Sequence, residues 1–168
     1  DGKGSVTLNA PSGSATLPTN MLVGLDAASR GNKAQISLAL IDPATLSPSL
    51  RSKVRHYPVV SLNLSIDKRP TLHNSPNGRI TISIPYTPTA EDLQNIDRVT
   101  AYYVDESGDI TEMKDAKYDS QKKAVVFTTS YFSRYFSGYR NTFSDVPESA
   151  WYYKPITFIA TRGITYGT

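Results

Sequence analysis

Few side chains of this chain have the types and spacing that nucleophilic or metal-dependent chemistry requires. Its two histidines, His56 and His73, are 17 residues apart, and each stands beside a proline-containing loop. The chain has no cysteine and no His-x-x-x-His or His-Glu spacing, so a zinc site would lack its usual ligand pattern. We therefore predict no metal, no cofactor and no cysteine nucleophile, and we assign both histidines to solvated loops.

A second candidate for chemistry is a run of carboxylates formed by Asp105, Glu106, Asp109 and Glu112. The acid and the nucleophile of a glycosidase would have to face each other across about 5 to 9 Å. As calcium ligands, these residues lack the full Asp-x-Asp-x-Asp-Gly pattern. A hydrophilic hairpin turn explains the run more simply, with Gly108 supplying the position of positive φ.

The tripeptide Tyr131-Phe132-Ser133 resembles a His-Phe-Ser corner at which some β-rich modules cleave themselves. In those modules the histidine activates the serine hydroxyl, which attacks the preceding carbonyl of a strained peptide bond. Tyr131 occupies the position of the base here, and phenols, whose ordinary pKa is about 10, are poor bases at neutral pH. We predict a packed aromatic corner that is not cleaved, and a chain that is not an enzyme.

Aromatic residues support an alternative function. The chain has 11 tyrosines, and the pairs Tyr102-Tyr103 and Tyr152-Tyr153 must each expose one ring if they are extended. Exposed rings stack on sugar faces, so the alternative is a carbohydrate-binding module of a surface glycoside hydrolase or scaffold protein. A groove with two or three coplanar exposed tyrosine rings would favour that alternative.

Charge does not indicate a nucleic-acid partner. The 18 basic and 15 acidic residues are spread along the chain, and the net charge is +3. A nucleic-acid interface would combine a basic face with interleaved aromatic residues, and that pattern is missing, so we predict no nucleic-acid partner. The chain begins at Asp1 and has no apolar run long enough for a signal peptide or a membrane span. We expect a piece of a longer protein, without membrane insertion.

Hydrophobic alternation predicts a mainly β chain. Leu62 and Leu64 recur at a period of two in one segment, as do Ile80 and Ile82 in another. The expected strands surround Val6 and Leu8, then Ala15 and Leu17, and continue over 34–41, 59–66, 79–84, 99–105, 110–113, 117–119, 124–129 and 131–139. Short helices are expected after Pro18, over 44–54 and over 89–96. Short connections favour an antiparallel β-sandwich-like module whose small helices plug its ends.

The C-terminal residues hold acidic, aromatic and glycine positions in a fixed order. They are Phe143-Ser144-Asp145-Val146-Pro147, then Trp151-Tyr152-Tyr153, then an apolar stripe of Tyr152, Ile156, Ile159 and Ala160, then Arg162-Gly163-Ile164-Thr165-Tyr166-Gly167. This series resembles the first half of an S-layer homology (SLH) repeat, with its Phe-x-Asp-Val, a Trp about six residues on, a short amphipathic helix and a closing Gly-Ile-x-x-Gly.

The resemblance implies a place and a partner. SLH repeats usually occur as triplets that fasten secreted proteins to the polysaccharide of a bacterial cell wall, so the expected location is extracellular, in the cell wall or S-layer at the bacterial surface. By the pattern of that family, Asp145 and Trp151 would contribute to the wall-polymer pocket. The second half of the repeat, a Phe-x-Pro followed by Thr-Arg-Ala-Glu, is absent from the chain. We therefore expect no binding of wall polymer by this chain alone.

Residues 57–139 also look like the β-modules that often stand before SLH repeats in bacterial surface hydrolases and scaffold proteins. We predict a β-rich spacer or accessory module over 1–141 and a truncated SLH motif, with a partial helix, over 142–168. The polar stretch Arg140-Asn141-Thr142 is the expected boundary. The predicted function is a non-catalytic link between an upstream functional region and wall-anchoring repeats.

Overall fold

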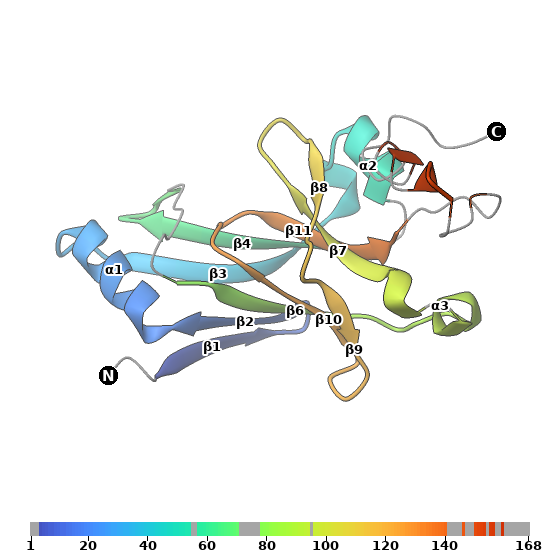
Figure 1. The fold of residues 1–168 in the computed structure, drawn as a ribbon. Helices are drawn as coiled ribbons and strands as arrows, with labels where there is room; N and C mark the ends of the chain where they lie inside the picture. Colours follow the sequence, from blue (N-terminus) through green and yellow to red (C-terminus); the bar gives the residue numbers. More distant parts are fainter. Residues whose placement is uncertain are drawn as a thin grey trace.

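The structure is a computed structural model that describes residues 4–54, 57–70, 78–94, 96–140, 146, 150–153, 155, 156 and 159. Over these residues the fold is mainly β: two antiparallel sheets with short helices around them (Figure 1). The predicted β-sandwich-like class is confirmed. Within the same residues, no helix is long and apolar enough to cross a lipid bilayer.

The first sheet has the strand order β1-β2-β6-β10-β9, and all neighbours are antiparallel. Its strands are β1 (Ser5–Ala10), β2 (Gly13–Pro18), β6 (Ile80–Pro85), β10 (Ala124–Thr129) and β9 (Lys117–Asp119). In the central strand, Ile82 lies opposite Ala15 of β2 and Phe127 of β10. The isoleucines predicted to share one face of β6 are all buried, as alternation requires.

The second sheet has the order β3-β4-β11-β7-β8, and a two-residue strand, β5, also pairs with β4. Its strands are β3 (Ala34–Ile41), β4 (Val59–Ile66), β5 (Arg69–Pro70), β11 (Arg134–Tyr139), β7 (Val99–Val104) and β8 (Ile110–Glu112). The predicted strands 34–41 and 59–66 pair with each other along their whole length, from Ala34–Ile66 to Ile41–Val59. Leu62 and Leu64 point into the interior, as predicted.

The main hydrophobic core lies between the two sheets. Ile80, Ile82 and Phe127 of the first sheet belong to one buried cluster with Leu62 and Tyr135 of the second. Helix α1 (Thr19–Ser29) adds Met21 and Leu25 to this cluster and lies at one end of the sheets (Figure 1). This position agrees with the prediction of a helix that plugs an end of the sandwich.

A second, smaller core covers the outer face of the second sheet. Helix α2 (Pro48–Val54) places Leu50 and Val54 against Tyr102 and Phe136. The single helix predicted over 44–54 is instead a 3₁₀ turn, Pro43–Thr45, followed by α2. The interruption has a local cause, because the Ser47 hydroxyl accepts a hydrogen bond from the backbone N–H of Leu50 and caps α2, which begins at a proline.

The helix predicted over 89–96 is shorter than expected. It comprises α3 (Ala90–Gln94), and the 3₁₀ turn Ile96–Arg98 follows it. Thr89 caps its start, as predicted: the backbone N–H of Asp92 donates to Thr89 Oγ1 at 3.2 Å. In return, the backbone N–H of Thr89 donates to Asp92 Oδ2 at 2.7 Å. Each side chain accepts a hydrogen bond from the backbone N–H of the other residue, which is the reciprocal arrangement of a capping box.

Candidate functional site

The candidate wall-polymer site is the segment around Trp151, the one tryptophan of the chain. The Trp151 side chain is 87% exposed, and its ring stands edge-on to Tyr152 with the centroids 5.6 Å apart. The backbone N–H of Tyr153 donates to the Ala150 carbonyl, and that of Ile156 donates to the Tyr152 carbonyl, each at 3.0 Å. This segment therefore forms a helical turn that presents an indole to solvent, where a sugar ring could stack on it.

The acidic partner predicted for this site, Asp145, lies outside the described residues. Of the predicted apolar stripe, Ile156 and Ile159 are half-buried, Tyr152 is exposed, and Ala160 is outside the described residues. The grouping of Asp145 with Trp151 in one pocket therefore stays a prediction. So does the boundary between 1–141 and 142–168, because Asn141 and Thr142 of the predicted stretch lie outside the described residues.

Arg140, the first residue of the predicted boundary stretch, forms an ion pair with Glu112. Nε of Arg140 donates to Glu112 Oε1 at 2.9 Å, and its Nη2 donates to the same oxygen. Thr100 Oγ1 donates to that oxygen at 3.2 Å, and the backbone N–H of Arg140 donates to the Arg98 carbonyl at 2.7 Å. The hydrogen bond with Glu112 raises the pKa of Arg140 above its ordinary value. The end of β11 is therefore fixed to β7 and β8 by side chains as well as by strand pairing.

The predicted aromatic corner is present, and its polar groups have structural partners. The hydroxyl of Ser133 donates to the Val104 carbonyl at 2.8 Å. The hydroxyl of Tyr135 donates to the Tyr131 carbonyl at 2.6 Å and lies 2.9 Å from Thr129 Oγ1. The Tyr131 side chain is 47% exposed. The Ser133 hydroxyl therefore forms a hydrogen bond that links its segment to β7. This geometry favours a structural role for Ser133 over nucleophilic attack.

The carboxylate run forms the predicted hairpin turn between β7 and β8. Asp105 Oδ1 accepts hydrogen bonds from the Ser107 hydroxyl and from the backbone N–H of Asp109, each at 2.8 Å. The Ser107 bond, followed by the backbone bonds, lowers the pKa of Asp105. Gly108 has a φ of 86°, as predicted for this turn. Asp105 thus organises its own loop, which is the usual role of an aspartate in a tight turn.

The remaining metal candidates give no site in the part of the chain that can be described. His56 and His73 both lie outside the described residues, so their assignment to loops stays a prediction. Among the residues that the structure does describe, no three His, Cys, Asp or Glu side chains come together in a group that could hold a metal ion.

The described tyrosines do not form the sugar platform that the alternative function requires. Tyr57 and Tyr86 are nearly parallel, with an interplanar angle of 22°, but Tyr86 is only 8% exposed. The Tyr86 hydroxyl donates to Asp92 Oδ2 at 2.8 Å, and burial together with this bond raises the pKa of Tyr86. Tyr131 is exposed, but its ring is tilted by 41° from that of Tyr103. Over the described residues, no pair of rings is both coplanar and exposed.

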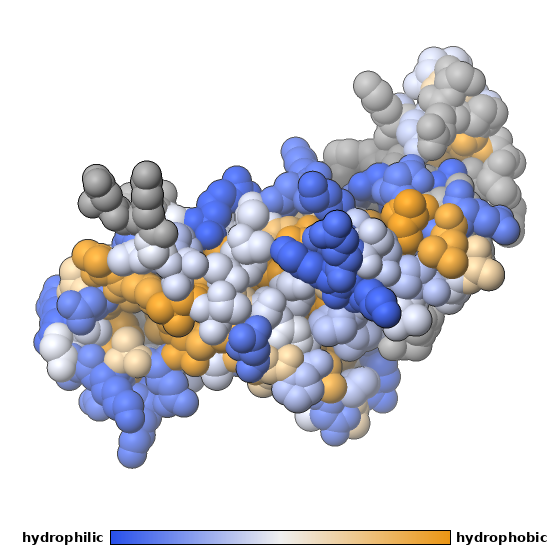
Figure 2. All heavy atoms as spheres, turned by 90° about the horizontal axis from the view of Figure 1, so that it is seen from below, coloured by the Kyte–Doolittle hydropathy of each residue, from blue (hydrophilic) through white to orange (hydrophobic). Residues whose placement is uncertain are grey.

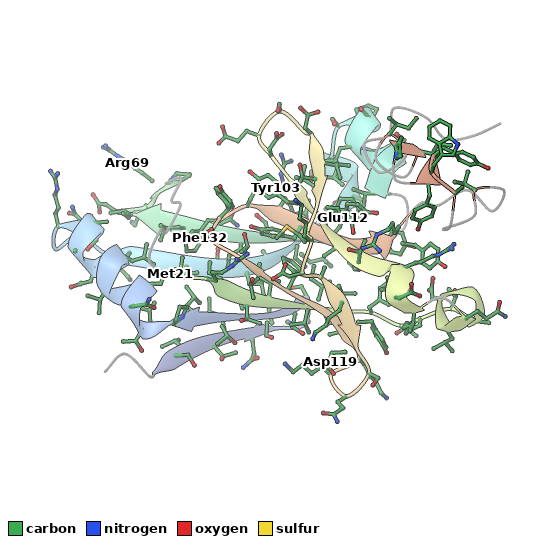
Figure 3. The ribbon with its side chains drawn as sticks, in the orientation of Figure 1. Met21, Arg69, Tyr103, Glu112, Asp119 and Phe132 are labelled. Carbon is green, nitrogen blue, oxygen red and sulfur yellow. The ribbon has the colours of Figure 1, made fainter. Side chains whose placement is uncertain are left out.

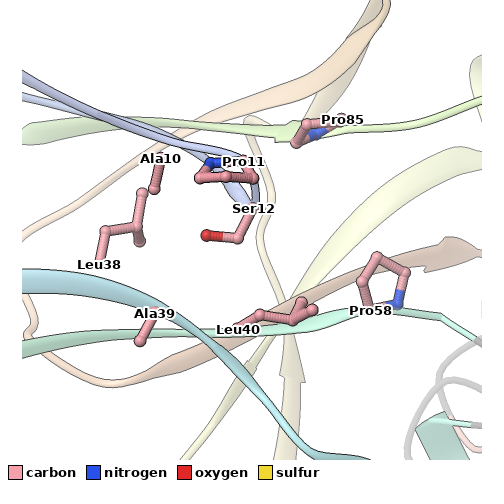
Figure 4. A pocket seen from close by; sticks show the side chains of 8 residues that line it. All are labelled: Ala10, Pro11, Ser12, Leu38, Ala39, Leu40, Pro58 and Pro85. Carbon is pink, nitrogen blue, oxygen red and sulfur yellow. The ribbon is translucent and has the colours of Figure 1, made fainter.

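An apolar pocket of about 360 Å³ lies between the β1–β2 turn and strand β3 (Figure 4). Its lining consists of Ala10, Pro11, Ser12, Leu38, Ala39, Leu40, Pro58 and Pro85. Leu40 is 59% exposed, and Figure 2 shows further apolar side chains on the face seen from below. The lining has one hydroxyl and no titratable group, so the pocket offers contact area without catalytic chemistry.

Two groupings of charged residues were not predicted from the sequence. The first is the Arg140–Glu112 pair, whose members are 28 residues apart. The second is a set of four exposed basic residues at one end of the module: Arg30, Lys33, Lys68 and Arg69. In the sequence, only the adjacent pair Lys68 and Arg69 indicated this set. Comparison with protein-family models, with curated proteins and with solved structures finds no match for this chain.

Proposed function

We propose that this chain is a non-catalytic module of a bacterial cell-surface protein. It would link an upstream functional region to SLH repeats, and the complete repeats would bind polysaccharide of the cell wall. The observation that carries the proposal is the ordered series of SLH-like positions from Phe143 to Gly167. The exposure of Trp151 supports it, because a wall-polymer pocket needs an aromatic ring that a sugar can reach.

The β-module has the properties of a spacer. Its second sheet is covered on both faces, by the first sheet and by α2, so two apolar clusters resist separation of its layers. The side chains that could have carried chemistry, Ser133 and Asp105, are hydrogen-bonded to their own backbone surroundings. A stiff, chemically inert unit can hold an upstream domain away from the wall surface.

Sedimentation with purified bacterial cell walls tests the proposed function. Two proteins are compared: the 168-residue chain, and the same chain extended through three complete SLH repeats. We expect the extended protein to pellet with the walls and the 168-residue chain to stay in solution. Firm pelleting of the 168-residue chain would contradict the role given to the complete repeats, and failure of the extended protein to pellet would contradict anchoring itself.

A further inference from the structure

Four basic residues from two distant segments meet at one end of the module. Arg30 and Lys33 belong to the connection between α1 and β3, and Lys68 and Arg69 belong to the hairpin between β4 and β5. Ala34 pairs with Ile66, and the backbone N–H of Asp67 donates to the Lys33 carbonyl at 2.9 Å, so the two segments are neighbours. All four basic residues are exposed, and Figure 3 shows Arg69 projecting from the end of the sheets near α1. We call these four residues the cationic end.

The backbone of the cationic end is unusual. Arg30 follows α1 with a φ of 51°, and Asp67 and Lys68, in the two-residue turn, have φ values of 50° and 63°. Glycine is the ordinary residue after a helix and at the second position of such a turn, because it has no Cβ to clash at positive φ. At both positions the chain carries a long cation instead. Lys123, in the β9–β10 turn, is also a cation at positive φ (49°), so this backbone feature is shared with another turn, and what distinguishes the cationic end is the grouping of its four charges.

The cationic end carries a local excess of positive charge. Residues 30–33 and 67–69 contain four basic residues and one acidic residue, and the rest of the chain holds 14 of each kind. Among the described residues, no ion pair joins Arg30, Lys33 or Lys68 to a carboxylate. By contrast, Lys122 in the β9–β10 turn lies 3.9 Å from Asp119. The cationic end is therefore a local source of positive potential.

We propose that the cationic end binds an anionic polysaccharide. This inference rests on the proposed function, which displays the module at a polysaccharide-covered surface. Single exposed ion pairs are weak and are screened by salt, so exposed cations on two adjoining turns suit a long polymer that meets several of them at once. Neither segment contains an aromatic residue on which a base could stack, so the site fits a polymer without exposed bases.

The test titrates the 168-residue chain with soluble polymers at low salt. Polygalacturonate supplies carboxylates, long-chain polyphosphate supplies phosphates, dextran is the neutral control, and a single-stranded oligonucleotide tests the competing partner. The test variant is Arg30→Gly with Lys68→Gly, which removes two cations and relieves two positive-φ positions, so it should melt no lower than the parent. A cation near a polyanionic surface typically contributes about fivefold in affinity, so we expect about a 25-fold loss for one or both anionic polymers.

Two further variants make the result specific. Lys33→Gln with Arg69→Gln removes the other two cations without changing positions of positive φ, and it should lose a similar factor. Lys122→Gln with Lys123→Gly removes the same charge from the other sheet, and it should bind within about twofold of the parent. Binding by the parent should weaken steeply as salt is raised.

Several outcomes would overturn the proposal: equal binding by the parent and both test variants, binding that salt does not weaken, binding to dextran as tight as to the anionic polymers, or tightest binding to the oligonucleotide. A preference between polygalacturonate and polyphosphate would identify the anionic group. Cell walls are not used in this experiment, so its failure leaves the anchoring result standing, and failure of anchoring leaves this titration interpretable.

Discussion

The Ile82→Ala change measures how much the core between the sheets contributes to stability. Ile82 is fully buried in the central strand of the first sheet, with Ala15 on one side and Phe127 on the other. Truncation removes most of the side chain and leaves a cavity. Ala15 is too small to fill that cavity, and Phe127 is held in contact with Tyr135 at 5.2 Å between ring centroids. Large-to-small changes at buried sites lower the free energy of unfolding by about 2 to 5 kcal/mol. Because the neighbours of Ile82 cannot move in to fill the cavity, we expect a loss in the upper part of this range, about 3 to 5 kcal/mol.

Urea unfolding followed by far-ultraviolet circular dichroism gives this free energy. We expect the urea concentration at the midpoint of unfolding to fall, while the slope of the unfolding free energy against urea concentration (the m-value) stays unchanged, because the same surface is exposed on unfolding. For a chain of this size, each kcal/mol lowers the melting temperature by about 2 to 4 °C, so the expected decrease is roughly 6 to 20 °C.

The matched control is Asp109→Asn, in the exposed turn between β7 and β8. The hydrogen bonds between Asp109 and Asp105 use the backbone of Asp109, which the substitution keeps, so the free energy of unfolding should change by no more than about 0.5 kcal/mol. A loss below about 1 kcal/mol for Ile82→Ala would refute the argument about the core. An equal loss for both variants would mean that the carboxylate turn belongs to a buried or ligand-bearing site, and the spacer assignment would have to be abandoned.

Three further predictions use other features of the module. Intact mass spectrometry should show one species near 18.4 kDa after days at neutral pH, and two fragments divided between Phe132 and Ser133 would restore self-cleavage. Ser137→Ala should raise the free energy of unfolding by about 1 kcal/mol, because the Ser137 hydroxyl is fully buried and has no hydrogen-bond partner among the described residues. A lower free energy of unfolding in chemical denaturation would contradict this. Burial raises the pKa of three tyrosines, so the stability they contribute is fully present below about pH 10, where unfolded tyrosines ionise, and is lost as pH rises above it. These tyrosines are Tyr86, Tyr102 and Tyr135. Absorbance at 295 nm should therefore show a late ionisation step that coincides with unfolding, and ionisation of all tyrosines in one step in the folded protein would contradict this.

Strands were predictable from the sequence because each has one buried face, which fixes a period of two. The segments 34–41 and 59–66 were predicted to the residue. The break before α2 was not predicted from the sequence, although Ser47 and Pro48 are the N-cap and first-turn residues that explain it. The outer cluster under α2 could not be derived locally, because its members Leu50, Tyr102 and Phe136 meet only through the tertiary arrangement.

The candidate sites also differ in whether local sequence or the tertiary arrangement determines them. Gly108 and the carboxylate turn follow from local turn chemistry, so their arrangement could be predicted. The cationic end depends on the pairing of β3 with β4, which brings Lys33 beside Asp67 from 34 residues away. Trp151 was identified by its place in a motif, and the structure adds its exposure. Its partner Asp145 lies outside the described residues, so that part of the site still rests on the motif.

The most direct test of wall anchoring is the affinity of the chain, extended through three complete SLH repeats, for purified cell-wall polysaccharide, measured with and without Trp151→Ala. The Trp151 side chain is 87% exposed and is not part of either buried cluster of the described residues, so the variant should keep the melting temperature of the parent. A nucleic-acid base stacked on an aromatic ring contributes about 1 to 3 kcal/mol, and with a similar contribution from a sugar face the variant should lose roughly 5- to 150-fold in affinity. Unchanged affinity in the variant, or no affinity in the extended parent, would contradict the account.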